Sequence, residues 1–379
     1  MIRLTSNLRS ISVGLQKLYG QGCTATVYRT LYNSTVLGVD NYSKARERIK
    51  TQFANVEDKF RMKMSAYANQ DSNSMIFTED LKHMIHLVEG TDQDLELVRN
   101  MMLKFSSQNR ELRFGSFIFG PVVMRMYYFV NRPKEAFEMF MNPEMDGFFD
   151  QLMSFQILMD LLLKNEMYEE VIQVFDVIQK KQVQGSKFPK NAVVLVLAAC
   201  YKLNTAESFN YAKNLWSEFT KYGHYPMRRA GTFAAALALN QKSPHVALEI
   251  LSSTKQQTYV TIRNLKVAAL ADLNRPDDTF PILRSVLQTD SATEKKHTFC
   301  EEIIAKTKAS VKKLGKPDIL QEFEKLENQL RNLNHITSES LDKQLCAEIS
   351  MGDHSTREPR VRYERRPQQR LRPGLEDMY

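Results

Sequence analysis

The chain has 379 residues and a formal net charge of +8, and 43% of its residues are hydrophobic, which is ample for a buried core. Its 14 glycines and 12 prolines are too few for a turn-rich β architecture or a low-complexity protein. Four widely separated cysteines argue against a disulfide framework or a zinc finger and favour a reducing compartment, and no apolar run approaches the roughly 20 residues that a membrane-spanning helix needs.

Residues 1–39 form a basic leader that differs from the rest of the chain. Four cations, Arg3, Arg9, Lys17 and Arg29, precede the first acidic residue, Asp40, and serine and threonine are frequent. Apolar residues recur on one helical stripe, at Leu4, Leu8, Ile11, Leu15 and Leu18. These features are typical of a mitochondrial transit peptide, so we expect a protein of the mitochondrial matrix. The alternative is an unstructured basic arm of a cytosolic protein.

Residues 40–70 have the composition of a strongly charged helical lead segment. After it, Thr78 is a plausible helix cap with Glu79 and Asp80 in the first turn, and Gly90 ends the helix. The apolar residues of 97–102 supply a second helix. We therefore expect a degenerate helical hairpin ahead of the clearer ones.

A short pattern of a small residue followed by apolar and bulky residues recurs along the middle of the chain. It begins at Ala136, Val171, Ala212 and Ala247, at separations of 35, 41 and 35 residues. A period near 35 is typical of helical hairpins, which cannot bury their apolar faces alone and stack into a superhelix. The sequence therefore predicts an all-α fold, an α-solenoid of helical hairpins over residues 71–290.

The best-formed hairpin spans about 152–190. Its first helix has Phe155, Leu158, Met159 and Leu162 on one face, and Lys164 to Tyr168 form the turn. We expect residues 291–346 to form a helical cap, because the end of a solenoid must present a polar outer face to water. Residues 347–379 hold seven arginines and six acidic residues and few apolar ones, so we expect a disordered, arginine-rich tail.

The hairpin at 154–171 resembles the pentatricopeptide repeat family. Residues 154–160, then Lys164, then Tyr168-Glu169-Glu170-Val171, are similar to the pattern of that repeat, and Phe188-Pro189-Lys190 resembles its ending, with about three residues inserted before it. The resemblance covers roughly residues 70–345. It implies a mitochondrial protein that takes part in RNA maturation and in sustaining the respiratory chain.

The resemblance also implies which residues contact RNA. A helical repeat reads one base with two or three side chains, and in this family a key position follows the aromatic residue at the start of the inner helix. That position is Gln156, and Asn264 falls near the same place in a later hairpin; both amides can donate and accept hydrogen bonds. The equivalents Pro121, Val194 and Ala234 cannot, so long sequence-specific reading is disfavoured.

Five cations are candidates for phosphate contacts on the inner surface of the solenoid. They are Lys202, Arg228, Arg229, Arg263 and Lys266. RNA binding predicts that they form a continuous basic track with Gln156 and Asn264 exposed along it. Ordinary solvated charges are the alternative for each of them.

Evidence for an enzyme, a cofactor or a metal site is weak. His83 and His86 are spaced as two ligands on one helix could be, but no third ligand accompanies them in the segment. Gly315-Lys316 lacks the upstream glycine of a phosphate-binding loop. We therefore predict a non-enzymatic protein without a cofactor, metal site or membrane span.

The function that these observations favour is binding of single-stranded mitochondrial RNA, promoting the maturation, processing or stability of transcripts. The expected partners are that RNA and an RNA-processing nuclease or other mitochondrial proteins. The alternative is a protein scaffold for assembly of the mitochondrial ribosome or a respiratory complex, which predicts an apolar groove in place of a basic track.

Overall fold

The computed structural model describes residues 30–69, 74–112, 117–289 and 298–349, and most of this part is helical. Most of the predicted leader and most of the predicted arginine-rich tail therefore lie outside the described residues. The predicted all-α fold is confirmed. The described strands are two residues long each: β1 (Phe299–Cys300) pairs in parallel with β2 (Ile336–Thr337).

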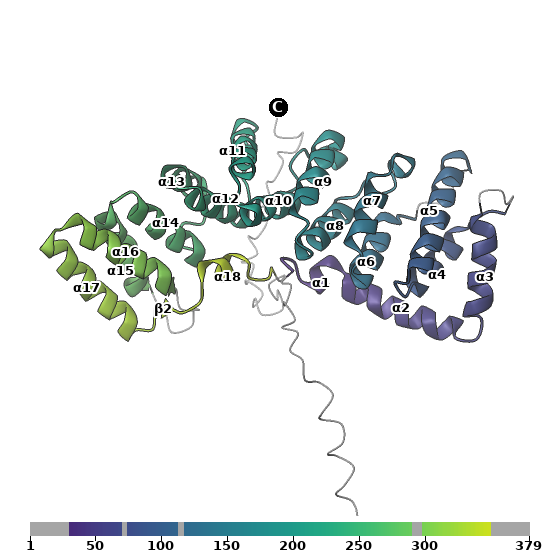
Figure 1. Cartoon of the computed structure of the whole chain (residues 1–379), viewed down its shortest axis with the longest axis horizontal. Helices are drawn as coiled ribbons and strands as arrows, with labels where there is room; N and C mark the ends of the chain where they lie inside the picture. Colours follow the sequence, from purple (N-terminus) through teal and green to yellow (C-terminus); the bar gives the residue numbers. More distant parts are fainter. Residues whose placement is uncertain (1–29, 70–73, 113–116, 290–297, 350–379) are drawn as a thin grey trace, which may run out of the picture.

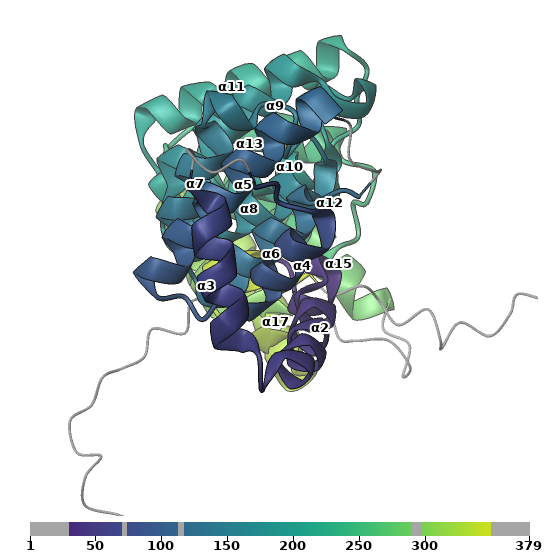
Figure 2. The ribbon, with the colours of Figure 1, turned by 90° about the vertical axis from the view of Figure 1, so that its right-hand side faces the viewer.

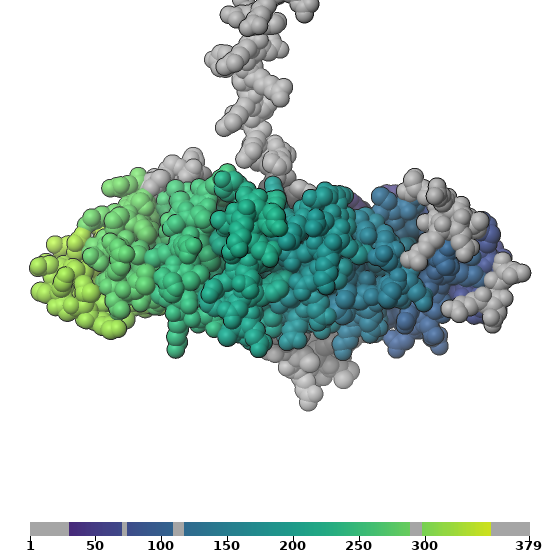
Figure 3. Space-filling model, turned by 90° about the horizontal axis from the view of Figure 1, so that it is seen from above, coloured from purple at the N-terminus to yellow at the C-terminus, as the bar shows by residue number. Residues whose placement is uncertain are grey.

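Seven helical hairpins follow one another along the long axis of the molecule (Figure 1; Figure 3). In each pair the first helix is the inner one and the second the outer one. The pairs are α4 (Thr78–Leu87) with α5 (Asp92–Leu112), α6 (Gly120–Val130) with α7 (Pro133–Met141), α8 (Leu152–Lys164) with α9 (Tyr168–Lys181), α10 (Lys190–Leu203) with α11 (Ala206–Lys221), α12 (Arg228–Asn240) with α13 (Pro244–Ser253), α14 (Val260–Asp272) with α15 (Phe280–Thr289), and α16 (Glu301–Leu314) with α17 (Pro317–Asn332). Short 3-10 turns, η1 (Pro143–Met145), η2 (Val183–Gly185) and η3 (Pro276–Thr279), punctuate the connections.

The hairpin at about 152–190 consists of α8 and α9. Glu169 and Glu170 lie in the first turn of α9, and Lys180 and Lys181 lie in its last turn. At both ends the charges interact favourably with the helix dipole. The chain turns between the helices at Glu166, whose φ of 62° lies in the left-handed region. The residues that begin the repeated pattern, Ala136, Val171, Ala212 and Ala247, are all buried, as a repeat that packs on its neighbours requires.

One apolar core runs through the hairpins from α4 to α14, and a second, smaller cluster joins α14 to the C-terminal helices. In α17 the side chains of Phe323, Leu326 and Leu330 are buried, and the helix packs on α15. Leu330 belongs to the face that closes the end of the core, while the opposite face of α17 is charged and exposed.

Two segments outside the hairpins run along the inner surface of the solenoid (Figure 1). The first is residues 30–53, which contain α1 (Ser34–Leu37) and α2 (Val39–Phe53); the second is residues 336–349, which contain β2 and α18 (Leu341–Leu345). They meet in the middle, where Ile349 N donates to Leu31 O at 2.7 Å and Asn33 N donates to Ile349 O at 3.4 Å. We call these two segments together the strap. Figure 2 shows α2 on the opposite side of the molecule from the outer helices α9 and α11.

The strap changes where the folded body begins and ends. Leu31, Tyr32 and Leu37 are buried in the main core, although the sequence assigns them to the leader of residues 1–39. At the other end Ile349 packs against the same core, inside the range predicted as tail. The folded body therefore starts before residue 40 and extends past residue 346.

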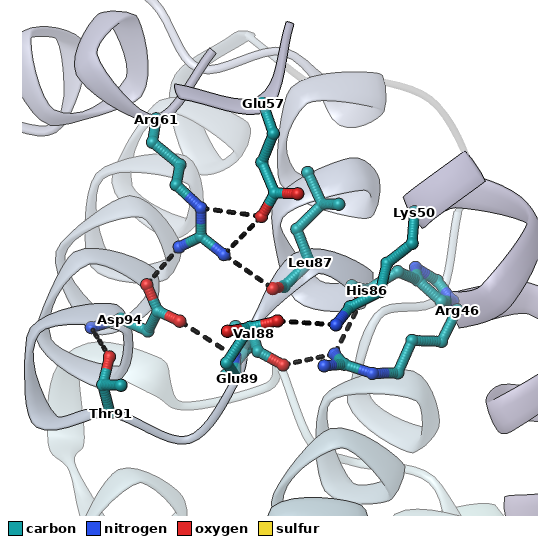
Figure 4. A network of polar contacts seen from close by, with 10 residues as sticks. All are labelled: Arg46, Lys50, Glu57, Arg61, His86, Leu87, Val88, Glu89, Thr91 and Asp94. Atoms are coloured by element: carbon teal, nitrogen blue, oxygen red, sulfur yellow. Dashed lines mark hydrogen bonds and ion pairs between the residues drawn. The ribbon is translucent and has the colours of Figure 1, made fainter. Parts of the chain in front are cut away.

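A polar network fixes α2 and α3 (Glu57–Ala68) to the C-terminal end of α4 (Figure 4). Arg46 donates to His86 O at 2.8 Å and also to Val88 O, and Arg61 donates to Leu87 O at 2.8 Å. Both guanidinium groups thus satisfy carbonyls that a helix end leaves without partners, and their charge suits the negative end of the dipole. Asp94 pairs with Arg61 and accepts from Glu89 N at 2.8 Å, which attaches α5 to the same network.

Candidate nucleic-acid interface

The inner surface, where the sequence places the RNA site, is covered by the strap. Tyr32 N donates to a carboxylate oxygen of Asp160 in α8 at 3.1 Å, and Arg125 of α6 donates to Leu37 O at 2.8 Å. Because neighbouring inner helices, α9 and the strap surround α8, its residues 154–162 are buried without interruption. A helix buried on all sides leaves no face for an extended ligand.

Three of the predicted RNA-binding residues lie under the C-terminal half of the strap. The Asn264 side chain has no exposed surface: Nδ2 donates to Gln344 Oε1 of the strap at 3.2 Å and to Thr298 O at 3.0 Å, and Oδ1 accepts from Cys300 N at 3.1 Å. Arg229 donates to Leu345 O at 2.6 Å. Lys202 forms an ion pair with Asp342 at 2.8 Å. The amide and both charges are therefore engaged in holding the chain's own terminal segments.

Two more of the predicted cations lie on α14. Arg263 is only 6% exposed, and Lys266 contacts the amide oxygen of Gln257, with its pKa lowered by burial. The expectation of a continuous exposed basic track with Asn264 along it is therefore wrong. For Asn264, Arg229 and Lys202 the physical reason is that the strap occupies the surface on which they were expected to be exposed. Whether any of them binds RNA stays a prediction.

Gln156 and Arg228 lie at a different place, the edge of the solenoid where the inner helices begin. Gln156 is 4% exposed, so it is not exposed as expected. Its Oε1 accepts from Asn191 Nδ2 at 2.8 Å, while its Nε2 has no hydrogen-bond partner among the described residues and the side chain lines a cavity. Arg228 lies over the ring of Tyr259, with Cζ 3.2 Å from the ring centroid.

Three neighbouring cavities along this edge form one groove, which we call the edge groove. Their volumes are about 960, 680 and 440 Å³; the first two share Leu152, and the last two share Tyr225, Pro226 and Met227. The groove crosses the N-terminal ends of α6, α8, α10 and α12. Its polar and aromatic lining includes Phe117, Arg125, Gln156, Phe188, Lys190, Asn191, His224, Tyr225, Arg228, Arg229 and Lys255.

The edge groove is positively charged. Five of its lining residues are lysine or arginine, none is aspartate or glutamate, and within the described part of the chain none of the five forms an ion pair. Burial lowers the pKa of Arg125, Arg228 and Arg229, and for Arg229 the neighbouring charge of Arg228 lowers it further. Cations that are partly buried and have no carboxylate partner favour an anionic ligand, because the negative charge of the ligand offsets the loss of hydration.

Sequence reasoning named Gln156, Arg228 and Arg229 but missed the rest of this groove. Tyr225 and Lys255 come from the connections between hairpins and Lys190 is the first residue of α10, so no helical spacing relates one of them to the next. The run from Tyr222 to Arg229 could have indicated the groove. It combines two tyrosines, a histidine and the two arginines that begin α12, which are residue types that bind single-stranded nucleic acid.

Elsewhere in the described ranges, no three His, Cys, Asp or Glu side chains gather closely enough to hold a metal ion. His86 stacks on Tyr42, and its Nδ1 lies 2.7 Å from Lys82 O, so this histidine packs against neighbouring residues of α2 and α4. No helix of the described residues is both long and apolar enough to cross a bilayer.

No protein-family model matches the sequence. The chain is 29% identical to the human protein "Pentatricopeptide repeat-containing protein 2, mitochondrial" over 325 residues, which is 86% of this chain and 82% of the human one. Proteins of the same name from Xenopus laevis and Danio rerio are 26% and 28% identical, over 86% and 73% of this chain and 84% and 71% of their own lengths. The predicted resemblance to the pentatricopeptide repeat proteins is thereby confirmed over most of the chain, and with it a mitochondrial localisation.

Proposed function

We propose that this protein resides in the mitochondrial matrix, binds single-stranded mitochondrial RNA, and promotes the maturation, processing or stability of transcripts on which the respiratory chain depends. The observation that carries the proposal is the acid-free lining of the edge groove. Its cations Lys190, Arg228 and Lys255 line the groove and form no ion pair with a carboxylate of the described residues. The vertebrate relatives are named pentatricopeptide repeat-containing proteins, and it is the resemblance to that family that implies an RNA ligand.

The groove suits a phosphate backbone for two physical reasons. Cations displace the counterions of a nucleic acid, which makes binding favourable and dependent on salt. In addition, α8, α10 and α12 begin at this edge, and the partial positive charge at each helix N-terminus adds to the field. A polyanion that follows the edge therefore meets cations and helix N-termini, all of positive sign.

The proposed mode of action is binding without catalysis. A bound segment of RNA is shielded from nucleases, and an RNA-processing nuclease can act at the ends of the shielded segment. The structure offers a surface for this role in the edge groove. In this mode the protein binds the RNA and positions it, and it performs no chemical step.

Binding to short single-stranded RNA is expected to weaken when two edge cations are neutralised together. For Lys190→Gln with Lys255→Gln, we expect the slope of log affinity against log salt to become smaller by about 1.4, since each phosphate contact contributes about 0.7 on a single strand. The control is Lys134→Gln with Lys180→Gln, two exposed lysines on the outer helices α7 and α9. Fluorescence anisotropy at several salt concentrations measures both pairs.

Crosslinking in mitochondria followed by sequencing tests the same proposal in the cell. We expect recovery of mitochondrial transcripts above background. Recovery of protein partners alone, together with no RNA binding by the purified protein, would contradict the proposal and favour a scaffold for ribosome or respiratory-complex assembly.

A further inference from the structure

The edge groove carries aromatic side chains as well as charge. Phe117 is 42% exposed in the first of the three cavities, and Tyr225 is 71% exposed where the second and third cavities meet. Both rings have a cation above one face: Lys82 Nζ lies 4.1 Å from the centroid of Phe117, and Lys255 Nζ lies 4.1 Å from that of Tyr225. Rings fixed on one side by a cation can receive a planar group on the other.

A second observation points to a ligand at the same groove. The side chain of Gln156 is almost completely buried, yet its Nε2 has no hydrogen-bond partner in the described structure. Asn191 holds the Oε1 atom, so the amide is oriented with its donor unused, and the residue lines the central cavity. A buried donor without a partner costs about 1–3 kcal/mol, which an acceptor on a bound molecule would recover.

The inner surface cannot take the same ligand while the strap is in place. Tyr32 is tied to Asp160, Leu345 to Arg229 and Asp342 to Lys202, so strap residues cover the surface from α8 to α12. The strap residues Leu31, Tyr32, Leu37 and Leu345 are part of the core. A closed inner surface leaves the edge as the accessible, positively charged route along the solenoid.

We propose that single-stranded RNA runs along the edge groove, outside the inner surface, with unpaired bases stacked on Phe117 and Tyr225 and phosphates on the cations between them. This inference rests on the proposed RNA binding and adds its path and mode. Stacking accepts every base, because each has a π face. The protein is therefore a sequence-tolerant binder of unpaired RNA that excludes duplexes, whose bases are already stacked on each other.

The test uses the full chain with a labelled single-stranded RNA of mixed sequence and a duplex of the same sequence. For Phe117→Ala with Tyr225→Ala we expect at least tenfold weaker binding of the single strand, since one stacked base contributes about 1–3 kcal/mol. Tyr225→Phe, which keeps the ring, should bind as the unchanged protein does. The matched control is Met62→Ala with Phe77→Ala, two exposed apolar residues outside the groove.

A second control separates the edge from the inner surface. Lys202→Gln removes a cation under the strap and should leave the affinity for RNA unchanged. If Lys202→Gln weakens binding and the Phe117/Tyr225 pair does not, the RNA follows the inner surface and the proposed path is wrong, although RNA binding stands. If the unchanged protein binds no RNA at all, the proposed function fails as well. Circular dichroism confirms that each variant is folded.

Crosslinking of thiouridine-substituted RNA gives an independent readout of the path. We expect the crosslinked peptides to contain Phe117 or Tyr225. Crosslinks confined to the strap or to the inner faces of α10 and α12 would overturn the inference. Equal binding of the duplex and the single strand would also overturn it, because stacking on exposed rings requires unpaired bases.

Discussion

Deletion of residues 1–37 is expected to lower the free energy of unfolding by about 5 kcal/mol relative to deletion of residues 1–29. The longer deletion removes Leu31, Tyr32 and Leu37, three buried side chains, and full burial of a large apolar side chain is worth roughly 1.5–3 kcal/mol. It also removes the N–H of Tyr32 from the buried carboxylate of Asp160. Because the total free energy of unfolding of a domain is about 5–15 kcal/mol, a loss of this size is a large part of the total.

Urea unfolding followed by circular dichroism measures the difference between the two deletions. Hydrogen exchange adds a local readout, because stability in a solenoid is distributed over neighbouring repeats. We expect faster exchange in α6, α8 and the segment 341–349, which the deleted residues contact, and little change in α16 and α17. Equal stability of the two deletion proteins would show that residues 30–37 contribute nothing to the core.

The burial of Leu31 limits where a transit peptide can be cleaved from the chain. If residues 30–37 are needed for the fold, removal of a transit peptide has to stop before Leu31. The predicted leader of residues 1–39 is then too long by about nine residues. The N-terminal residue of the protein purified from mitochondria, determined by mass spectrometry, is expected to precede Leu31.

The hairpins were predictable because their causes are local. In α8 and α9 the apolar spacing, the acidic first turn and the basic last turn lie within thirty residues of one another, and the pattern of a small residue followed by apolar and bulky ones recurs at Ala136, Ala212 and Ala247. Each of these features acts over three or four residues along one helix. Repetition then implied stacking and a continuous core.

The strap was not predictable because its contacts join distant parts of the chain. Tyr32 is 128 residues from Asp160, and Asn264 is 80 residues from Gln344. No spacing within either segment indicates such a partner. The same reason explains why Asn264 is not exposed as predicted. Its position in the inner helix is that of a base-reading residue, but its amide is bonded to Gln344 of the strap. Phe117 and Tyr225 were not predicted as lining residues of the edge groove for a related reason: they lie in connections and not on the periodic face of a helix.

Asp160 is the point at which the N-terminal half of the strap is anchored. One carboxylate oxygen accepts from Tyr32 N at 3.1 Å and the other from the hydroxyl of Tyr128 at 3.0 Å. No lysine or arginine of the described residues forms an ion pair with it. Burial raises the pKa of Asp160 to about 7, although both hydrogen bonds act to lower it. The group therefore binds a proton more tightly in the folded state than in the unfolded chain, where its pKa is about 3.9.

Replacement Asp160→Asn is expected to make the protein more stable than the unchanged chain at pH 8 and to flatten its dependence on pH. Between about pH 4 and pH 7 the folded state of the unchanged protein holds the extra proton, so the contribution of Asp160 to the free energy of unfolding falls as pH rises through this window and is constant above it. Asparagine keeps an oxygen for Tyr32 N–H and never ionises. Each unit of pKa difference is worth about 1.4 kcal/mol, so the effect is measurable.

The comparison with Asp160→Ala separates the charge from the hydrogen bonds. Alanine leaves Tyr32 N–H and the Tyr128 hydroxyl buried without an acceptor, and each such group costs about 1–3 kcal/mol, so we expect a loss of roughly 2–4 kcal/mol at any pH. Urea unfolding at pH 5 and pH 8 measures all three proteins, and the difference between the unchanged and the asparagine chains cancels the other titrating groups. An unchanged protein that gains stability relative to Asp160→Asn as pH rises would show that the carboxylate is stabilised as an anion, which the absence of an ion-pair partner argues against.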